Sequence, residues 1–127
     1  MSAHFELAQE ALRSARLLLD AGDCHGAANR AYYAFFYAAR GAIGYLTGMK
    51  VGDIKTHRGL RRMFQLHVVK PGLIDQRIAV RFNDVEVTRI IADYGDDRLQ
   101  TAEAEAAVRD ADAFVAACEN LVREFNR

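Results

Sequence analysis

Arg89 is the residue whose type and position point most directly to chemistry. It lies in the sequence Arg-Ile-Ile-Ala-Asp-Tyr of residues 89–94. At helical spacing it shares a stripe with four apolar residues, Ile78, Phe82, Val85 and Ala92. A guanidinium group on an apolar face is costly unless it is paired or faces a polar cleft. Because Asp93 lies one turn later, the segment predicts either a structural ion pair or a cleft where Arg89 binds a phosphate or carboxylate group.

A second candidate is the locally basic segment of residues 50–70, which contains six Lys or Arg residues and one acidic residue. Within it, Arg58, Arg61 and Arg62 recur at helical spacing, and guanidinium groups suit bidentate contacts with phosphate. Residues 84–112 carry the opposite charge, with nine Asp or Glu residues and three Arg. The segment predicts a solvated helix face, with a phosphate-binding surface around these three arginines as the alternative.

A third candidate is a polar and aromatic stripe at three- and four-residue steps, formed by Arg30, Tyr33, Tyr37 and Arg40. Such a stripe can stack bases or neutralise phosphates. Tyrosine hydroxyls in helical bundles also bond to neighbouring helices, so core and rim positions are the alternative. Asn29, next to this stripe, is a candidate buried polar residue.

The spacing of the histidines and cysteines argues against metal binding. His57 follows Lys55 and Thr56 at a predicted helix start, where it is either a proton donor or a surface residue. The four histidines show no i, i+4 spacing, and the two cysteines show no CxxC spacing. We therefore expect no metal site and a reducing compartment.

These residues must be positioned by helices, because the sequence shows helical periodicity and no convincing alternation of strand type. Helices are predicted at 2–21, at 24–47 after an Asp23 cap and ending at Gly48, at 57–69, at 73–94, and from Thr101 onward. The second is apolar almost all round and belongs at the centre. Residues 1–127 are thus expected to form one domain, an all-α, up-and-down bundle of four to five helices.

Several function classes are excluded by the sequence. It contains no phosphate-cradling GxxxxGK, no GxGxxG, no HExxH and no nucleophile elbow, and we expect no cofactor. Lys plus Arg and Asp plus Glu both number 17, so no global charge attracts nucleic acid or a membrane. The most apolar stretch, residues 27–46, is interrupted by charged, Asn and Gly residues, which argues against a membrane span. We expect a cytoplasmic protein.

The order of motifs resembles that of the HEPN domain superfamily over nearly the whole chain. The resemblance rests on Arg30-Ala31-Tyr32-Tyr33-Ala34-Phe35-Phe36, on Lys55-Thr56-His57-Arg58-Gly59, and on Arg89-x-x-Ala92-Asp93-Tyr94-Gly95. The sequence is most similar to the small stand-alone prokaryotic branch with R-A-Y-Y-A-x-F and A-D-Y-G signatures. The resemblance implies a five-helix bundle that forms a homodimer, often encoded beside a minimal nucleotidyltransferase in toxin–antitoxin or defence modules.

The resemblance also implies a site and one departure from it. Active HEPN ribonucleases carry R-x-x-x-x-H near a dimer cleft and cut RNA without a metal, with Arg stabilising the phosphate and His moving the proton. On this chain the arginine is Arg89, and the histidine position is Tyr94. A tyrosine, with an ordinary pKa of about 10, is a poorer general base at neutral pH than a histidine, at about 6.5. Such acid–base help is worth about 10²–10⁴ in rate.

Two main functions are therefore predicted. The first is a HEPN module that binds nucleotide, RNA or a partner nucleotidyltransferase through Arg89, Asp93, Asn29, Arg30, Tyr33, Arg58, Arg61 and Arg62. The alternative is a metal-independent endoribonuclease toxin that uses Arg89 with Tyr94 or His57. Tyr94 is also a candidate acceptor of nucleotidyl groups from a partner transferase. Unless His57 or another histidine supplies the missing base, ribonuclease activity should be weak or absent, so the distance between His57 and Arg89 is the main structural unknown.

Overall fold

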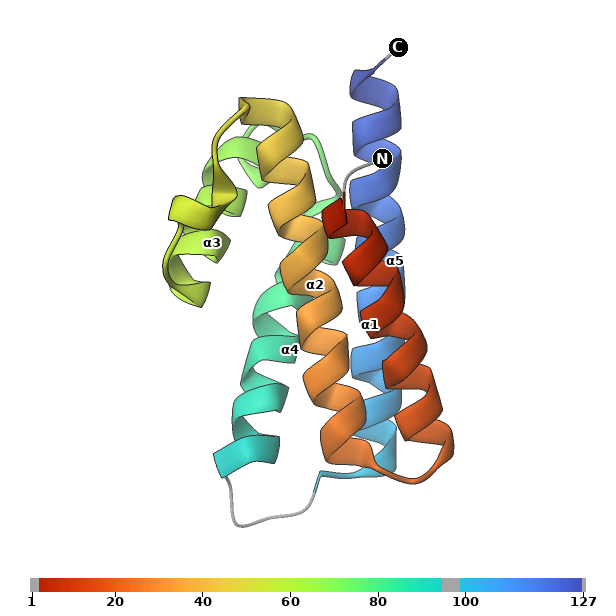
Figure 1. Ribbon diagram of the computed structural model, residues 1–127. Coiled ribbons are helices and arrows are strands. Elements are labelled where there is room, and N and C mark those ends of the chain that lie inside the picture. Colours follow the sequence, from red (N-terminus) through yellow and green to blue (C-terminus); the bar gives the residue numbers. More distant parts are fainter. Residues whose placement is uncertain (1–2, 95–98, 127) are drawn as a thin grey trace.

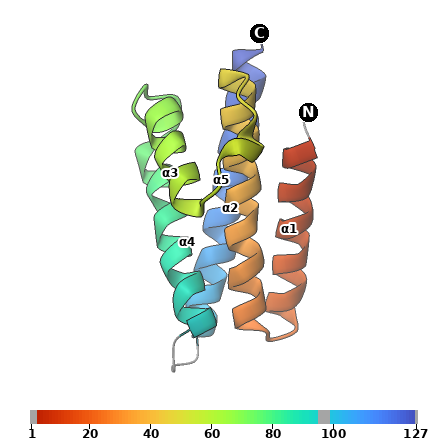
Figure 2. The same ribbon diagram turned by 60° about the vertical axis from the view of Figure 1, so that its left-hand side comes forward.

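Five α-helices account for most of residues 3–94 and 99–126, which are the residues that the computed structural model describes (Figure 1). Their bounds are α1 Ala3–Asp20, α2 Cys24–Thr47, α3 His57–Phe64, α4 Gln76–Tyr94 and α5 Thr101–Phe125. A 3₁₀ turn, η1 (Val51–Asp53), precedes α3, and a π-helical turn, η2 (Gln65–Val69), follows it. The four long helices alternate in direction in both views (Figures 1 and 2). The predicted all-α bundle is confirmed, and the described residues contain no strand.

Side-chain caps define the helices that carry the candidate residues. The Asp23 carboxylate accepts a hydrogen bond from Gly26 N (2.8 Å), as predicted for the start of α2. At the other end Gly48 adopts a left-handed conformation, with φ of 69°, which glycine tolerates at a helix end. The Thr56 hydroxyl accepts a hydrogen bond from Gly59 N (2.8 Å) and fixes the start of α3 at His57. His57 is therefore held in the first turn of its helix.

Three helix boundaries differ from the prediction. The first helix spans Ala3–Asp20 rather than 2–21, and Ser2 lies outside the described residues. The last five residues of the predicted 57–69 helix wind as the π turn η2. The fourth helix begins at Gln76 rather than at residue 73 because the Asp75 carboxylate accepts the backbone N–H of Arg77 (2.8 Å) and acts as its cap.

The centre of the bundle is α2, which contacts α1, α3, α4 and α5. Its fully buried alanines allow close approach of neighbouring helices; they are Ala27, Ala28, Ala31, Ala34, Ala38, Ala39 and Ala42. An aromatic cluster of Phe35, Phe64, Phe82 and Phe114 fills the space between α2, α3, α4 and α5. Tyr32 lies one turn before Phe35 on α2 and contacts Phe82 of α4 with a ring-centroid distance of 6.0 Å. The aromatic core thus fixes Tyr32 against α4.

Candidate functional site

Tyr32, fully buried on α2, is where two of the predicted site residues meet. The Nδ1 atom of His57, at the start of α3, lies 2.7 Å from the Tyr32 hydroxyl, and the two rings stack at 5.3 Å. The guanidinium carbon of Arg89, on α4, lies 4.7 Å from the centroid of the same tyrosine ring. Three helices therefore bring His57 and Arg89 to one side chain.

A buried carboxylate, Glu86, holds the arginines in place. Glu86 Oε1 accepts a hydrogen bond from Arg89 Nη2 (3.2 Å), and Glu86 Oε2 lies 3.8 Å from Arg61 Nη1. Arg89 Nη1 also donates to Asp93 Oδ2 at 3.2 Å, which is the ion pair that the i, i+4 spacing indicates. The Glu86 side chain is 10% exposed and that of Arg89 15%, so each charge depends on the others for compensation.

Several polar atoms of this cluster are buried without a hydrogen-bond partner among the described residues. They are Arg40 Nε, Arg61 Nη1, Arg89 Nε and Glu86 Oε2. Arg40 joins the cluster from α2, where its guanidinium group lies 4.8 Å from the centroid of the Phe36 ring. Phe36 in turn contacts His57, with ring centroids 5.0 Å apart. Buried N–H groups without acceptors are costly, and a phosphate group is the acceptor that best suits clustered guanidinium groups.

Burial lowers the pKa of His57 below its ordinary value, and so do the positive charges of Arg89, Arg61 and Arg40, whereas the Glu86 carboxylate raises it. The net effect favours a neutral imidazole at pH 7. The second ring nitrogen, Nε2, has no hydrogen-bond partner among the described residues, yet it is not among their buried atoms. His57 therefore offers one ring nitrogen to Tyr32 and the other to solvent.

The lowered pKa of His57 predicts a pH dependence of stability. The ordinary value, about 6.5, applies to the unfolded chain. As the pH falls below 6.5 toward the folded value, the unfolded chain binds more protons than the folded chain, so the free energy of unfolding decreases. His4, whose pKa is lowered by burial and by Arg40, adds an effect of the same sign. Urea unfolding at pH 7.5 and at pH 5.5 should show the loss, and His57→Gln should reduce it. A loss of equal size in His57→Gln would contradict this role.

The other predicted residues divide into two groups. Tyr33 lies edge-on to Tyr32, at 5.4 Å between centroids, and carries Arg30 over its ring at 4.9 Å. Both are half-buried at the rim of the cluster, whereas Asn29 is half-buried and makes no hydrogen bond among the described residues. Arg58 and Arg62 are exposed on α3, whereas Arg61 on the same helix is half-buried.

Tyr94 lies away from the cluster at the end of α4, where its side chain is 80% exposed. It makes no ring contact or hydrogen bond among the described residues. That Tyr94 accepts a nucleotidyl group stays a prediction. Its exposed side chain would be accessible to a partner transferase.

Sequence reasoning did not assign Tyr32, Glu86 or Arg40 to the site. Glu86 precedes Arg89 by three residues, so the helical spacing that singled out Asp93 applies to it equally. Tyr32 lies within the same motif as Tyr33 but on the buried stripe, where a tyrosine is more often a core residue. Arg40 was predicted as part of the polar and aromatic stripe, and nothing in the sequence indicates that it lies near His57.

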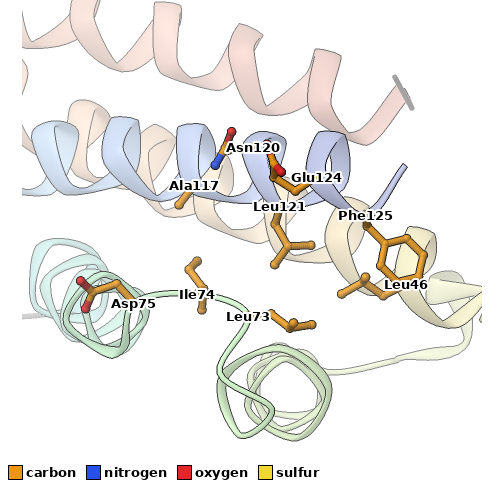
Figure 3. Close-up of a pocket in the computed structure, with 9 residues that line it drawn as sticks. All are labelled: Leu46, Leu73, Ile74, Asp75, Ala117, Asn120, Leu121, Glu124 and Phe125. Atoms are coloured by element: carbon orange, nitrogen blue, oxygen red, sulfur yellow. The ribbon is translucent and has the colours of Figure 1, made fainter. Parts of the chain in front are cut away.

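A separate apolar pocket of about 420 Å³ lies between the C-terminal parts of α2 and α5 and the segment before α4 (Figure 3). Leu46, Leu73, Ile74, Leu121 and Phe125 supply its apolar lining. It contains none of the predicted site residues.

In the described part of the chain no cluster of His, Cys, Asp or Glu side chains could hold a metal ion. No helix there has the length and apolar character to cross a membrane.

Comparison with known proteins identifies the family. The model of the HEPN domain matches residues 1–121. A protein of Methanocaldococcus jannaschii named "Putative toxin" is 32% identical over 98% of this chain and 90% of its own length. A UPF0332 protein of Thermotoga maritima is 30% identical over 94% of this chain and 89% of its own. A UPF0332 protein of Pyrococcus horikoshii is 41% identical over 58% of this chain, and the match spans about half of that protein (49%). The chain belongs to the HEPN family.

Proposed function

We propose that this HEPN protein acts as a toxin-type module that binds RNA at the site formed by Tyr32, His57, Arg61 and Arg89. The observation that carries the proposal is the set of buried guanidinium nitrogens without a hydrogen-bond partner, on Arg40, Arg61 and Arg89, whose positive charges all act on His57. Phosphate oxygens supply those acceptors. The name of the relative from Methanocaldococcus jannaschii agrees with a toxin-type role.

The aromatic rim favours a nucleic acid over an isolated phosphate. Tyr33, Phe36 and Tyr37 are half-buried and contact one another in a row along α2. Single-stranded nucleic acids bind where aromatic side chains stack with bases beside a positively charged groove. Arg30 over Tyr33 and Arg40 over Phe36 place cations beside the aromatic rings of this row.

A comparison of neighbouring arginines tests the site. Arg61→Ala removes a half-buried guanidinium group that lies 3.8 Å from Glu86, whereas Arg62→Ala removes an exposed one on the same helix. In titrations of labelled single-stranded RNA at several salt concentrations, Arg61→Ala should weaken binding. It should also reduce the slope of log affinity against log salt by about 0.7, the value for one phosphate contact. Arg62→Ala should leave both nearly unchanged. The reverse order would place the RNA on the outer face of α3.

A second function, metal-independent cleavage of that RNA, is favoured by the meeting of His57 and Arg89 on Tyr32. His57 Nε2 would take the proton of a ribose 2′-hydroxyl, and the 2′-oxygen would form a bond to the adjacent phosphorus. The bond between phosphorus and the 5′-oxygen of the next nucleotide then breaks. His57 gives the proton to that leaving oxygen, and a 2′,3′-cyclic phosphate remains on the other product. Arg89 would stabilise the charge on the phosphate.

Substitution of His57 separates binding from cleavage. His57→Gln keeps the arginines and should therefore retain the phosphate contribution to RNA binding, while the cleavage rate should fall by about 10²–10⁴, the usual worth of general acid–base catalysis. The measurement is the appearance of a 2′,3′-cyclic phosphate end on a labelled RNA. Cleavage at the wild-type rate in His57→Gln would exclude His57 as the base.

We also propose that a second copy of the chain covers the outer face of α4. Four large apolar residues on this helix are each between 43% and 52% exposed: Val80, Val87, Ile90 and Ile91. Apolar residues clustered in this way are uncommon on the surface of a monomer and are typical of an interface. Light scattering should give twice the 14.2 kDa mass of one chain. Val87→Glu should yield the monomer, and the control Leu17→Glu, at an exposed site on α1, should not. A monomeric wild-type protein would contradict the proposal.

A further inference from the structure

We propose that Glu86 and Tyr32 hold His57 in the tautomer that carries its proton on Nδ1, so that Nε2 presents a lone pair to the 2′-hydroxyl of bound RNA. The inference rests on the proposed RNA binding and adds the two residues that orient His57; a preference for ribose over deoxyribose is its consequence. Tyr32 and Glu86 are positioning residues here, because they act on the ligand through His57.

The bond between Tyr32 and His57 has two possible directions. At 2.7 Å, either the tyrosine hydroxyl donates to Nδ1, or an Nδ1–H group donates to the tyrosine oxygen. Both groups can act in either way, so the distance by itself does not choose. The first direction leaves the imidazole proton on Nε2, and the second leaves Nε2 as an acceptor. The charges around Tyr32 must make the choice.

Glu86 selects the second direction. Its carboxylate faces the Tyr32 hydroxyl and, after burial, is the main cause of the raised pKa of this tyrosine. Glu86 Oε1 already accepts a hydrogen bond from Arg89, but Glu86 Oε2 is buried and has no donor within hydrogen-bond distance among the described residues. A hydroxyl proton directed toward Glu86 relieves that unpaired oxygen. The lone pair of the tyrosine oxygen then faces Nδ1, which must therefore carry the proton.

The surroundings of His57 oppose the addition of a second proton to its imidazole ring. The guanidinium groups of Arg40, Arg61 and Arg89 and the burial of the imidazole oppose a second proton, and Glu86 is the one carboxylate among the described residues that favours it. A neutral ring with its proton on Nδ1 has Nε2 as its acceptor. His57 is only partly buried and Nε2 is not among the fully buried unpartnered atoms, so this nitrogen is the one left for a ligand.

The ligand that fits this acceptor is a ribose hydroxyl beside a phosphate. Arg61 and Arg89 provide cations for the phosphate next to His57, and the 2′-hydroxyl is the donor that distinguishes RNA from DNA. A hydrogen bond from the hydroxyl to Nε2 would therefore favour RNA. In a cleavage reaction the same nitrogen would accept the proton.

The tautomer is measured directly by ¹⁵N–¹H correlation spectra of the histidine rings in the full-length protein without RNA. The wild-type protein should show His57 protonated on Nδ1. Tyr32→Phe removes the hydroxyl, and Glu86→Gln replaces the carboxylate oxygen with a group that can donate; both should move the proton to Nε2 in part of the molecules. Tyr33→Phe alters the neighbouring ring and should leave the spectrum as in wild type. An Nε2–H tautomer in wild type, or no response to either substitution, would overturn the inference.

The substrate preference is measured with RNA and DNA strands of the same sequence. The wild-type protein should bind the RNA roughly threefold to tenfold more tightly, the worth of one neutral hydrogen bond. Tyr32→Phe should lower the RNA affinity toward that of the DNA. Equal wild-type affinities would overturn the ribose preference while leaving phosphate binding in place. Binding of neither strand would overturn the proposed function, and the ring spectra would still decide the tautomer.

Discussion

Replacing Arg89 with alanine is expected to weaken the binding of single-stranded RNA about 10- to 100-fold, which corresponds to the loss of a charge-assisted hydrogen bond. Arg89 is held over the ring of Tyr32 at 4.7 Å, and its Nε–H group is buried without an acceptor. Its loss therefore removes a cation that the fold has already placed. A fluorescence-anisotropy titration with labelled RNA measures the effect.

Two further variants distinguish a lost contact from a lost fold. Arg89→Lys keeps the charge but not the planar fork, so it should recover only part of the affinity. In Arg89→Ala the buried Glu86 carboxylate keeps a single nearby cation, Arg61, at 3.8 Å. The double variant Glu86→Ala with Arg89→Ala removes that unpaired charge as well, and it should fold yet still bind RNA weakly. Wild-type affinity in folded Arg89→Ala would remove Arg89 from the site.

Replacing Phe114 with alanine should lower the free energy of unfolding by about 3–5 kcal/mol. The Phe114 ring is fully buried on α5 and contacts Phe35 at 4.5 Å, Phe64 at 5.2 Å and Phe82 at 5.4 Å between centroids. One substitution thus leaves a cavity bordered by α2, α3 and α4. Since a domain of this size has a total stability of about 5–15 kcal/mol, the loss is a large fraction of it.

Urea denaturation followed by circular dichroism measures the effect of Phe114→Ala. Leu17→Ala serves as the control because Leu17 is 71% exposed on α1, and its change should stay within about 0.5 kcal/mol. A loss of less than about 1 kcal/mol in Phe114→Ala would mean that the aromatic cluster does not hold the helices together.

The helices were predictable because their signals are local. Asp23 and Thr56 were recognisable as caps from their residue types and from the helical patterns that follow them. The late start of α4 was missed because Leu73 and Ile74 continue the apolar pattern, and only the contact between Asp75 and Arg77 shows where the helix begins. The π turn of η2 carries the periodicity of an ordinary helix and gives no warning in the sequence.

The site was predictable only where its members share a helix. Arg89 and Asp93 are four residues apart, so their ion pair follows from helical geometry. The approach of His57 to Tyr32 spans 25 residues and depends on how α3 packs against α2, which periodicity does not specify. The HEPN pattern directs attention to residue 94, whereas the histidine beside Arg89 is supplied by α3. The base would thus come from a different helix than the motif implies.

The most direct test of RNA binding at this site is a titration of labelled single-stranded RNA, in EDTA, into the wild-type protein, Arg89→Ala and Arg62→Ala. Complex and cleavage products are followed in the same samples. Binding at the Tyr32 cluster predicts a complex with the wild-type protein that survives the chelator, persists in Arg62→Ala and is weakened about 10- to 100-fold in Arg89→Ala. Equal binding by the wild-type protein and Arg89→Ala, or no binding by the wild-type protein, would contradict it.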